Sequence, residues 1–145
     1  MRTYQYPALL EPGDEAGLVV TFPDVPEAIS QGDDAADARD MAAEALGLAL
    51  LTYLAEGRSL PAASPCVEGL VSVTVAPEIA AKLAILEAFR DARISKIELA
   101  RRIGKDEKEV RRILDPMHPT KLAPLQAALA ALGRRLVIGV EEIAA

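Results

Sequence analysis

The sequence predicts an α+β fold in two parts, a small sheet with one long helix followed by short helices. Alternating apolar residues in the first half indicate strands, and the pattern becomes helical after Pro77. Net charge changes sign at the same place, from −9 over residues 1–76 to +3 over residues 77–145. We therefore expect two domains, 1–76 and 77–145, with different partners. An acidic surface that only improves solubility is the alternative.

The composition favours a soluble protein with an aliphatic core. Of 145 residues, 51% are hydrophobic, 26% charged and only 3% aromatic. No apolar run approaches the roughly 20 residues of a membrane span, and the N-terminus has no signal-peptide pattern. The single cysteine, Cys66, has no partner for a disulfide or a zinc site. We expect a cytoplasmic protein without metal or cofactor.

The first half has the pattern ββ(β)αβ. Residues 2–10 and 17–22 alternate and predict an antiparallel hairpin, with a short third strand at 28–31. Asp33 or Asp34 caps a long helix that runs to Gly57. Its end, "ALGLALLTYLAE", is apolar nearly all round, so we expect it to meet a second surface, either the other domain or another chain. Another strand is predicted at residues 67–75.

The second half contains the spacing of a helix-turn-helix. Pro77 can begin the first of its short helices, at 77–92, and another is expected at 121–132. Between them, Ser95 with Glu98 and Asp106 with Glu109 resemble capping boxes at the starts of two helices. The residues expected to form the contact between these helices are Leu99, Ala100, Ile103, Gly104, Val110 and Ile113. The alternative is an ordinary pair of amphipathic helices.

Basic residues on this pair indicate DNA binding. Lysine and arginine on the outer face of the second helix could hold phosphates or read guanine. Glu109 could accept a hydrogen bond from cytosine, or it could cap its helix. Asp106 and Glu107 are most simply residues that stabilise the start of the helix, although their negative charge weakens affinity for DNA. The candidate DNA-binding residues are Lys96, Lys105, Lys108, Glu109, Arg111, Arg112 and Lys121.

The chain closes with a short apolar run that predicts a strand. A lone terminal strand needs a partner, and the same strand of a second subunit would make a homodimer or a higher oligomer able to reach two DNA half-sites. The alternative is pairing with a sheet edge of its own chain. The candidate dimerisation residues are Leu136, Val137, Ile138 and Val140.

Several segments resemble the HicB-type antitoxins of bacterial type II toxin–antitoxin pairs, essentially from end to end. They are "YPALLEP", "GLVVTFPDVPEAISQGDD", "AAEALGLAL", "LVSVTV" and "LDPMHPTKL". "FPDVP" followed by "GD" and an alanine-rich helix is the most specific. Two departures stand out: Asp34 replaces a frequent hydroxyl cap, and "DEKEVRR" has none of the Ser, Gln and Tyr frequent in the family's recognition helix, so no operator sequence is implied.

The resemblance implies a partial ribonuclease-H-like first domain that covers the active surface of HicA, a small basic ribonuclease toxin. The helix-turn-helix would then bind operator DNA and repress the antitoxin's own operon. An acidic domain suits such a toxin, because complementary charge speeds association. The residues expected to contact the toxin are Tyr4, Tyr6, Phe22, Asp24 and Asp33.

Two rival functions are less well supported by the residues. Ribonuclease-H chemistry needs several carboxylates around two metal ions, but "RTYQYPALL" contains no acid, and most nearby aspartates start a helix. His118 lies in a loop without catalytic spacing, so we expect no enzyme and no catalytic residue. The other rival is a stand-alone helix-turn-helix transcription regulator with an N-terminal ligand- or protein-binding domain, although no ligand-binding fingerprint is present.

Overall fold

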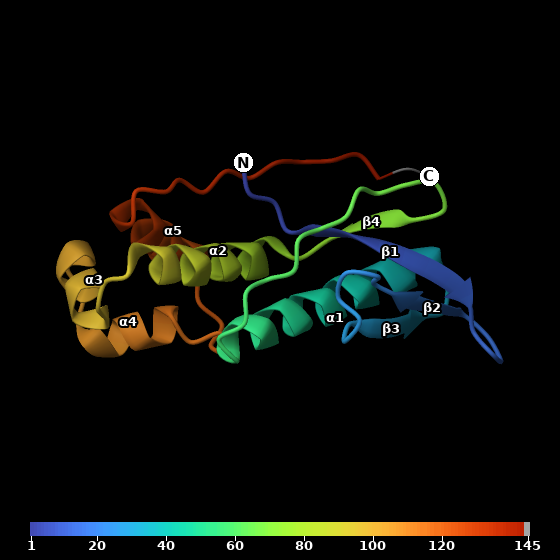
Figure 1. The fold of residues 1–145 in the computed structure, drawn as a ribbon, viewed down its shortest axis with the longest axis horizontal. Coiled ribbons are helices and arrows are strands. Elements are labelled where there is room, and N and C mark those ends of the chain that lie inside the picture. The colour runs from blue at the N-terminus through green and yellow to red at the C-terminus, as the bar shows by residue number, and fades with distance from the viewer. Residues whose placement is uncertain (144–145) are drawn as a thin grey trace.

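The computed structural model describes residues 1–143, which form an elongated α+β molecule (Figure 1). The sheet and α1 occupy one end, α3 and α4 the other, and α2 lies between them (Figure 1). The elements are β1 (Gln5–Pro12), β2 (Leu18–Thr21), β3 (Ile29–Gly32), α1 (Ala35–Ala55), β4 (Val71–Thr74), α2 (Pro77–Ala92), α3 (Lys96–Ile103), α4 (Glu107–Ile113) and α5 (Leu122–Ala131).

The sheet has the order β3-β2-β1-β4, and every neighbouring pair is antiparallel. The predicted hairpin is confirmed, with Leu10 opposite Val20. Because successive side chains of a strand point to opposite faces, Tyr6 and Ala8 of β1 share the face that forms a core with α1, and Pro7 between them is buried on the other face. The strand predicted at residues 67–75 is shorter than expected, only Val71–Thr74.

Local signals at both ends explain where α1 begins and stops. The Asp34 carboxylate accepts a 2.8 Å hydrogen bond from the Asp37 backbone N–H, so Asp34 rather than Asp33 is the cap. Just before it, a side chain at Gly32 would collide with the backbone of Ala38, so only glycine fits this strand-to-helix corner. Gly57 adopts the left-handed conformation (φ +74°) that terminates helices, as predicted.

The second surface expected for α1 is α2 of the same chain. Gly47 lies so close to α2 that a Cβ there would be 3.2 Å from Ile79 Cγ2. Leu83 of α2 is fully buried in the same cluster as Leu46 and Leu50 of α1. The apolar end of α1 is therefore covered by the helical part of the chain, the first of the two alternatives.

A second cluster lies on the other side of α2, against α5 and the end of α4. It contains Ile85, Ile113 and Leu125. The boundary predicted between residues 76 and 77 coincides with the start of α2, where Pro77 occupies the first turn. Nevertheless, α2 contributes buried side chains to the cores on both sides of that boundary.

The chain beyond α5 forms no strand between residues 132 and 143, so the strand expected at residues 136–140 is absent from the single chain. A strand exists only through ladder hydrogen bonds to a neighbour, and this segment has none. It extends back along the molecule toward β4 (Figure 1), and Gln5 Nε2 donates a 2.8 Å hydrogen bond to Glu141 Oε1. Val137, Ile138 and Val140 are exposed.

Residues 1–143 contain neither a membrane-spanning helix nor a cluster of metal ligands. No helix there is both long enough and apolar enough to cross a membrane. No group of three or more His, Cys, Asp or Glu side chains in the described range could hold a metal ion.

Candidate functional site

The pair α3–α4 is built by caps and one glycine. Ser95 Oγ accepts from the Glu98 N–H at 3.0 Å, and Asp106 Oδ1 accepts from the Glu109 N–H at 2.8 Å. Gly104, at φ +66°, lets the chain leave α3 and turn sharply before Asp106. The turn therefore places the two helices against each other.

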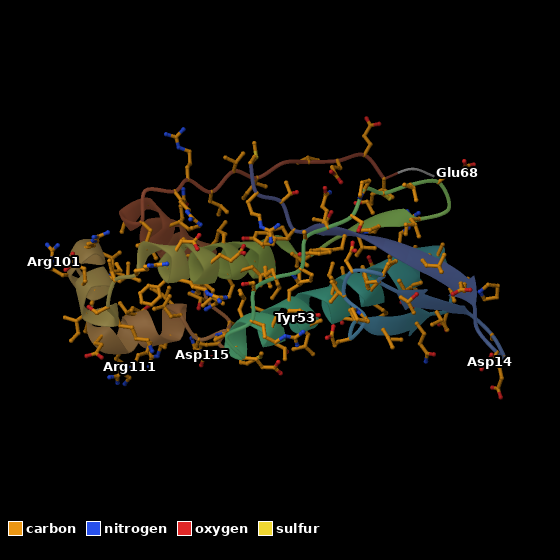
Figure 2. The ribbon with its side chains drawn as sticks, viewed as in Figure 1. Asp14, Tyr53, Glu68, Arg101, Arg111 and Asp115 are labelled. Atoms are coloured by element: carbon orange, nitrogen blue, oxygen red, sulfur yellow. The ribbon has the colours of Figure 1, made fainter. Side chains whose placement is uncertain are left out.

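The residues predicted to join α3 to α4 are largely inside. Leu99 and Val110 are completely buried, Ile113 is 1% exposed and Ala100 8%. Ile103 is half-buried against the same clusters. Packing of these inner faces leaves the charged residues on the outside of this end, where Arg101 and Arg111 project away from the molecule (Figure 2).

The acidic residues of α3 and α4 neutralise their own arginines. Glu107 Oε1 lies 2.8 Å from Arg111 Nη2, one helical turn away, and Glu109 Oε2 lies 3.7 Å from Arg112 Nη1. Asp106 remains the cap. The two arginines expected to contact DNA are thus already paired within α4.

Glu98 of α3 also pairs with arginines, and this corrects the prediction that it forms a capping box with Ser95. Its carboxylate accepts from Arg101 Nε at 2.8 Å and from Arg102 Nε at 3.1 Å. The hydrogen bonds from Arg101 and then Arg102 lower the pKa of Glu98 to about 2. Ser95 therefore caps α3, but the glutamate of the expected capping box is occupied by arginines.

The lysines of this end are exposed and differ from the arginines. Within residues 1–143, no ion pair joins the four lysines predicted to contact DNA. They are Lys96, Lys105, Lys108 and Lys121. Their charges are available to a polyanion without first breaking a contact.

A buried lysine fixes the far end of α4, and sequence reasoning missed it. Lys82 of α2 is only 3% exposed. Its ammonium donates to the backbone oxygens of Arg112 (3.1 Å) and Ile113 (2.8 Å) and to Thr120 Oγ1 (2.7 Å). Burial lowers the pKa of Lys82 to about 8, although the charge of Asp115 acts in the opposite direction.

Lys82 thus joins three segments: its own helix α2, the end of α4 and the loop that follows α4. The carbonyls at the end of a helix have no partner within the helix, and here an ammonium supplies one. The hydroxyl of Thr120 belongs to the "DPMHPT" loop, whose start is held by the 3.0 Å hydrogen bond from the Met117 N–H to Asp115 Oδ1. The one signal in the sequence was a lone lysine inside the apolar stretch "IAAKLAIL".

The residues predicted to contact a toxin divide into buried and exposed ones. Tyr4, Tyr6 and Phe22 are 6%, 1% and 1% exposed, so in this structure they build the core and offer almost no surface. Asp24 is partly exposed and accepts from the Ser64 N–H and hydroxyl at 2.8 and 2.7 Å. Asp33 is exposed at the start of α1.

A different feature marks the surface of this half, a shallow groove between β3 and the outer side of α1. We call it the α1–β3 groove. Its walls include Glu27, Ile29, Ala45, Leu48, Thr52 and Glu56. Tyr53 of α1, labelled in Figure 2, also lines the groove. Its hydroxyl donates to Glu27 Oε2 at 2.6 Å, and the Arg58 guanidinium lies 3.8 Å from its ring centre.

The fold and its charges define a class of small two-part protein, with an acidic sheet unit at one end and a pair of short helices bearing exposed lysines at the other. A family model described as "HicB_like antitoxin of bacterial toxin-antitoxin system" matches residues 5–84. The chain belongs to this HicB-like antitoxin family.

Curated relatives agree over nearly the whole chain. Antitoxin HicB 1 of Photorhabdus laumondii is 37% identical over 141 residues, 97% of this chain and 90% of the relative. Antitoxin HicB of Escherichia coli K12 is 38% identical over 132 residues, 91% and 96% of the two chains. Antitoxin HicB of Pseudomonas fluorescens is 33% identical over 134 residues, 91% and 92%. This membership supports an antitoxin role, with a toxin as the binding partner.

Proposed function

We propose that the protein binds and neutralises a small basic ribonuclease toxin of the HicA type and represses its own operon by binding operator DNA. The first activity belongs to the sheet unit and α1, and the second to α3 and α4 acting as a helix-turn-helix. The order of β1, β2, β3, α1 and β4 supports the partial ribonuclease-H-like description of the first unit.

One observation carries the proposal: the two kinds of charge are gathered at opposite ends. Exposed lysines surround α3 and α4, whereas Asp14 lies at the tip of the sheet end (Figure 2). DNA phosphates attract the first end, and a basic toxin is attracted to the second. Because the sites are well separated, one chain could hold both partners at once.

Operator binding requires two copies in this proposal. Specific sites are usually reached by dimers that span two half-sites. The exposed apolar residues 137, 138 and 140 would pair with the same segment of a second chain and form the strand that a single chain lacks. Deleting residues 136–145 should give monomers in light scattering, and an unchanged mass would refute this mode of dimerisation.

Neutralisation is tested by growth rescue and RNA cleavage. Expression of a HicA-type toxin from the same operon should arrest growth, and co-expression of this protein should restore it. Purified protein should likewise stop the toxin from cleaving RNA. A toxin that remains active with a molar excess of the protein would refute the antitoxin proposal.

Operator binding is tested by replacing both arginines of α4. Arg111→Ala with Arg112→Ala should abolish the gel shift of the operon's promoter DNA, because contacts to bases or phosphates are lost. Toxin binding should be retained. Loss of both activities in a folded variant would argue against separate sites.

A further inference from the structure

The outer side of α1 exposes an apolar stripe that the fold leaves uncovered. Leu48 is 59% exposed, Met41 40%, and Ile29 of the neighbouring strand β3 63%. Met41, Ala45, Leu48 and Thr52 follow one another at steps of four and three residues, so they lie on one face of the helix. Exposed apolar residues that form a continuous patch commonly mark an interaction surface.

Acidic residues flank this stripe on both sides. Asp40 and Glu44 lie one helical turn apart on α1, on the side of the helix next to the stripe that contains Leu48. They therefore form a negative row along one side of the stripe. Glu27 lies across the groove, where the hydrogen bond from Tyr53 lowers its pKa and so favours its charged form. Arg58 also lines the groove and forms ion pairs with Glu27 (3.5 Å) and Glu56 (3.4 Å), so one positive charge offsets part of the rim. An apolar centre within a polar rim is the usual anatomy of a protein–protein interface.

We propose that the α1–β3 groove is the surface on which the basic toxin docks, with an apolar side chain of the toxin against Leu48 and Ile29 and its lysines or arginines against the acidic rim. This inference rests on the proposed antitoxin function and assigns that function to one face.

The charge of the groove decides between a toxin and a second copy of this chain. Self-association through this face would bring two acidic rims together inside a half that carries −9. Like charges facing each other at an interface cost several kcal/mol, whereas a basic partner gains attraction from the same residues. The buried Tyr4, Tyr6 and Phe22 would then support the β1–β2 side of the sheet without touching the toxin.

The sharpest test is a matched pair of substitutions. Leu48→Lys places a charge at the centre of the groove, and Val67→Lys makes an equivalent change at a residue that is also 59% exposed, in the loop before β4. Binding of the purified HicA-type toxin should weaken about thirtyfold or more in the first variant, as for a central contact residue. It should be unchanged in the second.

A charge reversal tests the rim in the same way. Glu44→Lys should weaken toxin binding about tenfold at low salt and less at high salt, because rim charges act through screened attraction. Asp14→Lys changes the charge of the same half by the same amount at the far tip of the sheet and should have a smaller effect. Equal effects would mean that overall charge, not this groove, attracts the toxin.

The outcomes separate this inference from the proposed function. If the natural chain fails to bind the toxin, the antitoxin proposal itself is wrong. If it binds, and Leu48→Lys binds equally well while remaining helical by circular dichroism, only the docking face is wrong. If Leu48→Lys instead lowers the mass of the free protein in light scattering without changing toxin affinity, the groove is a contact between copies, which also overturns the inference.

Discussion

The two ends of the molecule treat their acidic residues in opposite ways. At the α3–α4 end, Glu98, Glu107 and Glu109 each lie one helical turn from an arginine and form an ion pair with it. At the sheet end, residues 1–76 contain twelve acids and only three arginines. Arg58 pairs with Glu27 and Glu56, and the other ten acids form no ion pair within residues 1–143. The formal charge of −6 is therefore the sum of one locally balanced surface and one strongly negative surface.

The position of the charges therefore matters more for binding than their total. Ion pairs between neighbouring exposed residues contribute about 0–1 kcal/mol each, so they are readily exchanged for contacts to a partner. The unpaired acids of the sheet end need no such exchange. A nucleic acid and a basic protein would thus each meet a surface suited to it on a chain whose net charge favours only the second.

Among the substitutions that test this contrast, the one expected to act most strongly removes the contact that ties α4 to α2. Lys82→Met removes all three hydrogen bonds from the end of α4 and the 114–121 loop, so α4 should lose its fixed orientation. Operator affinity should fall about tenfold or more, equivalent to ~1.4 kcal/mol. A fluorescence anisotropy titration with promoter DNA would measure it.

Two controls separate positioning from general damage. Thr120→Val removes one of the three acceptors and should cause a smaller loss of operator affinity. Toxin binding by Lys82→Met should stay within about twofold of the natural chain, because the α1–β3 groove does not include α2. A variant that binds DNA normally would show that Lys82 is only a packing residue.

A smaller effect on operator affinity, in the opposite direction, is expected when the acids that pair with the arginines of α4 are neutralised. Glu107→Gln with Glu109→Gln removes two negative charges and releases Arg111 and Arg112. Operator affinity should rise roughly three- to tenfold, with a steeper dependence on salt, since more cations reach phosphates. Asp14→Asn with Glu15→Gln makes the same charge change at the sheet end and should leave operator affinity nearly unchanged.

The smallest effect concerns acid stability at α3. The folded-state pKa of Glu98 is about 2, below its ordinary value of 4.5, so its contribution to stability is present above pH 4.5 and is lost as the pH falls toward 2. Melting temperatures of the natural chain and Glu98→Gln should therefore converge between pH 4.5 and 2. A constant difference across that range would contradict the shifted pKa. NMR titration of the carboxyl group measures it directly.

Features that depend on near neighbours were predicted from the sequence. The β1–β2 hairpin, the cap at the start of α1, Pro77 at the start of α2 and the turn at Gly104 all follow from residue types within a few positions of one another. Such signals describe the backbone directly, because caps, glycines and prolines restrict its dihedral angles.

Features that depend on distant residues were not predicted. Alternation shows which residues of β1 share a face, but not that Tyr6 faces the core rather than a partner. The acceptors of Lys82 lie 30 to 38 residues away along the chain. The apolar run after α5 has the composition of a strand but no neighbour to pair with in the single chain. Even so, the exposed stripe on α1 could have been found from the steps of four and three between Met41 and Thr52.

Helix α2 gives the molecule a property that neither end has alone. Leu83 lies in the core beneath the sheet, and Ile85, two residues later, lies in the core shared with α5. If α2 moved away from one core, apolar side chains of the other core would become exposed as well. The binding ends are separate, yet the chain should melt cooperatively in a single transition, so damage to either core shortens the lifetime of both activities.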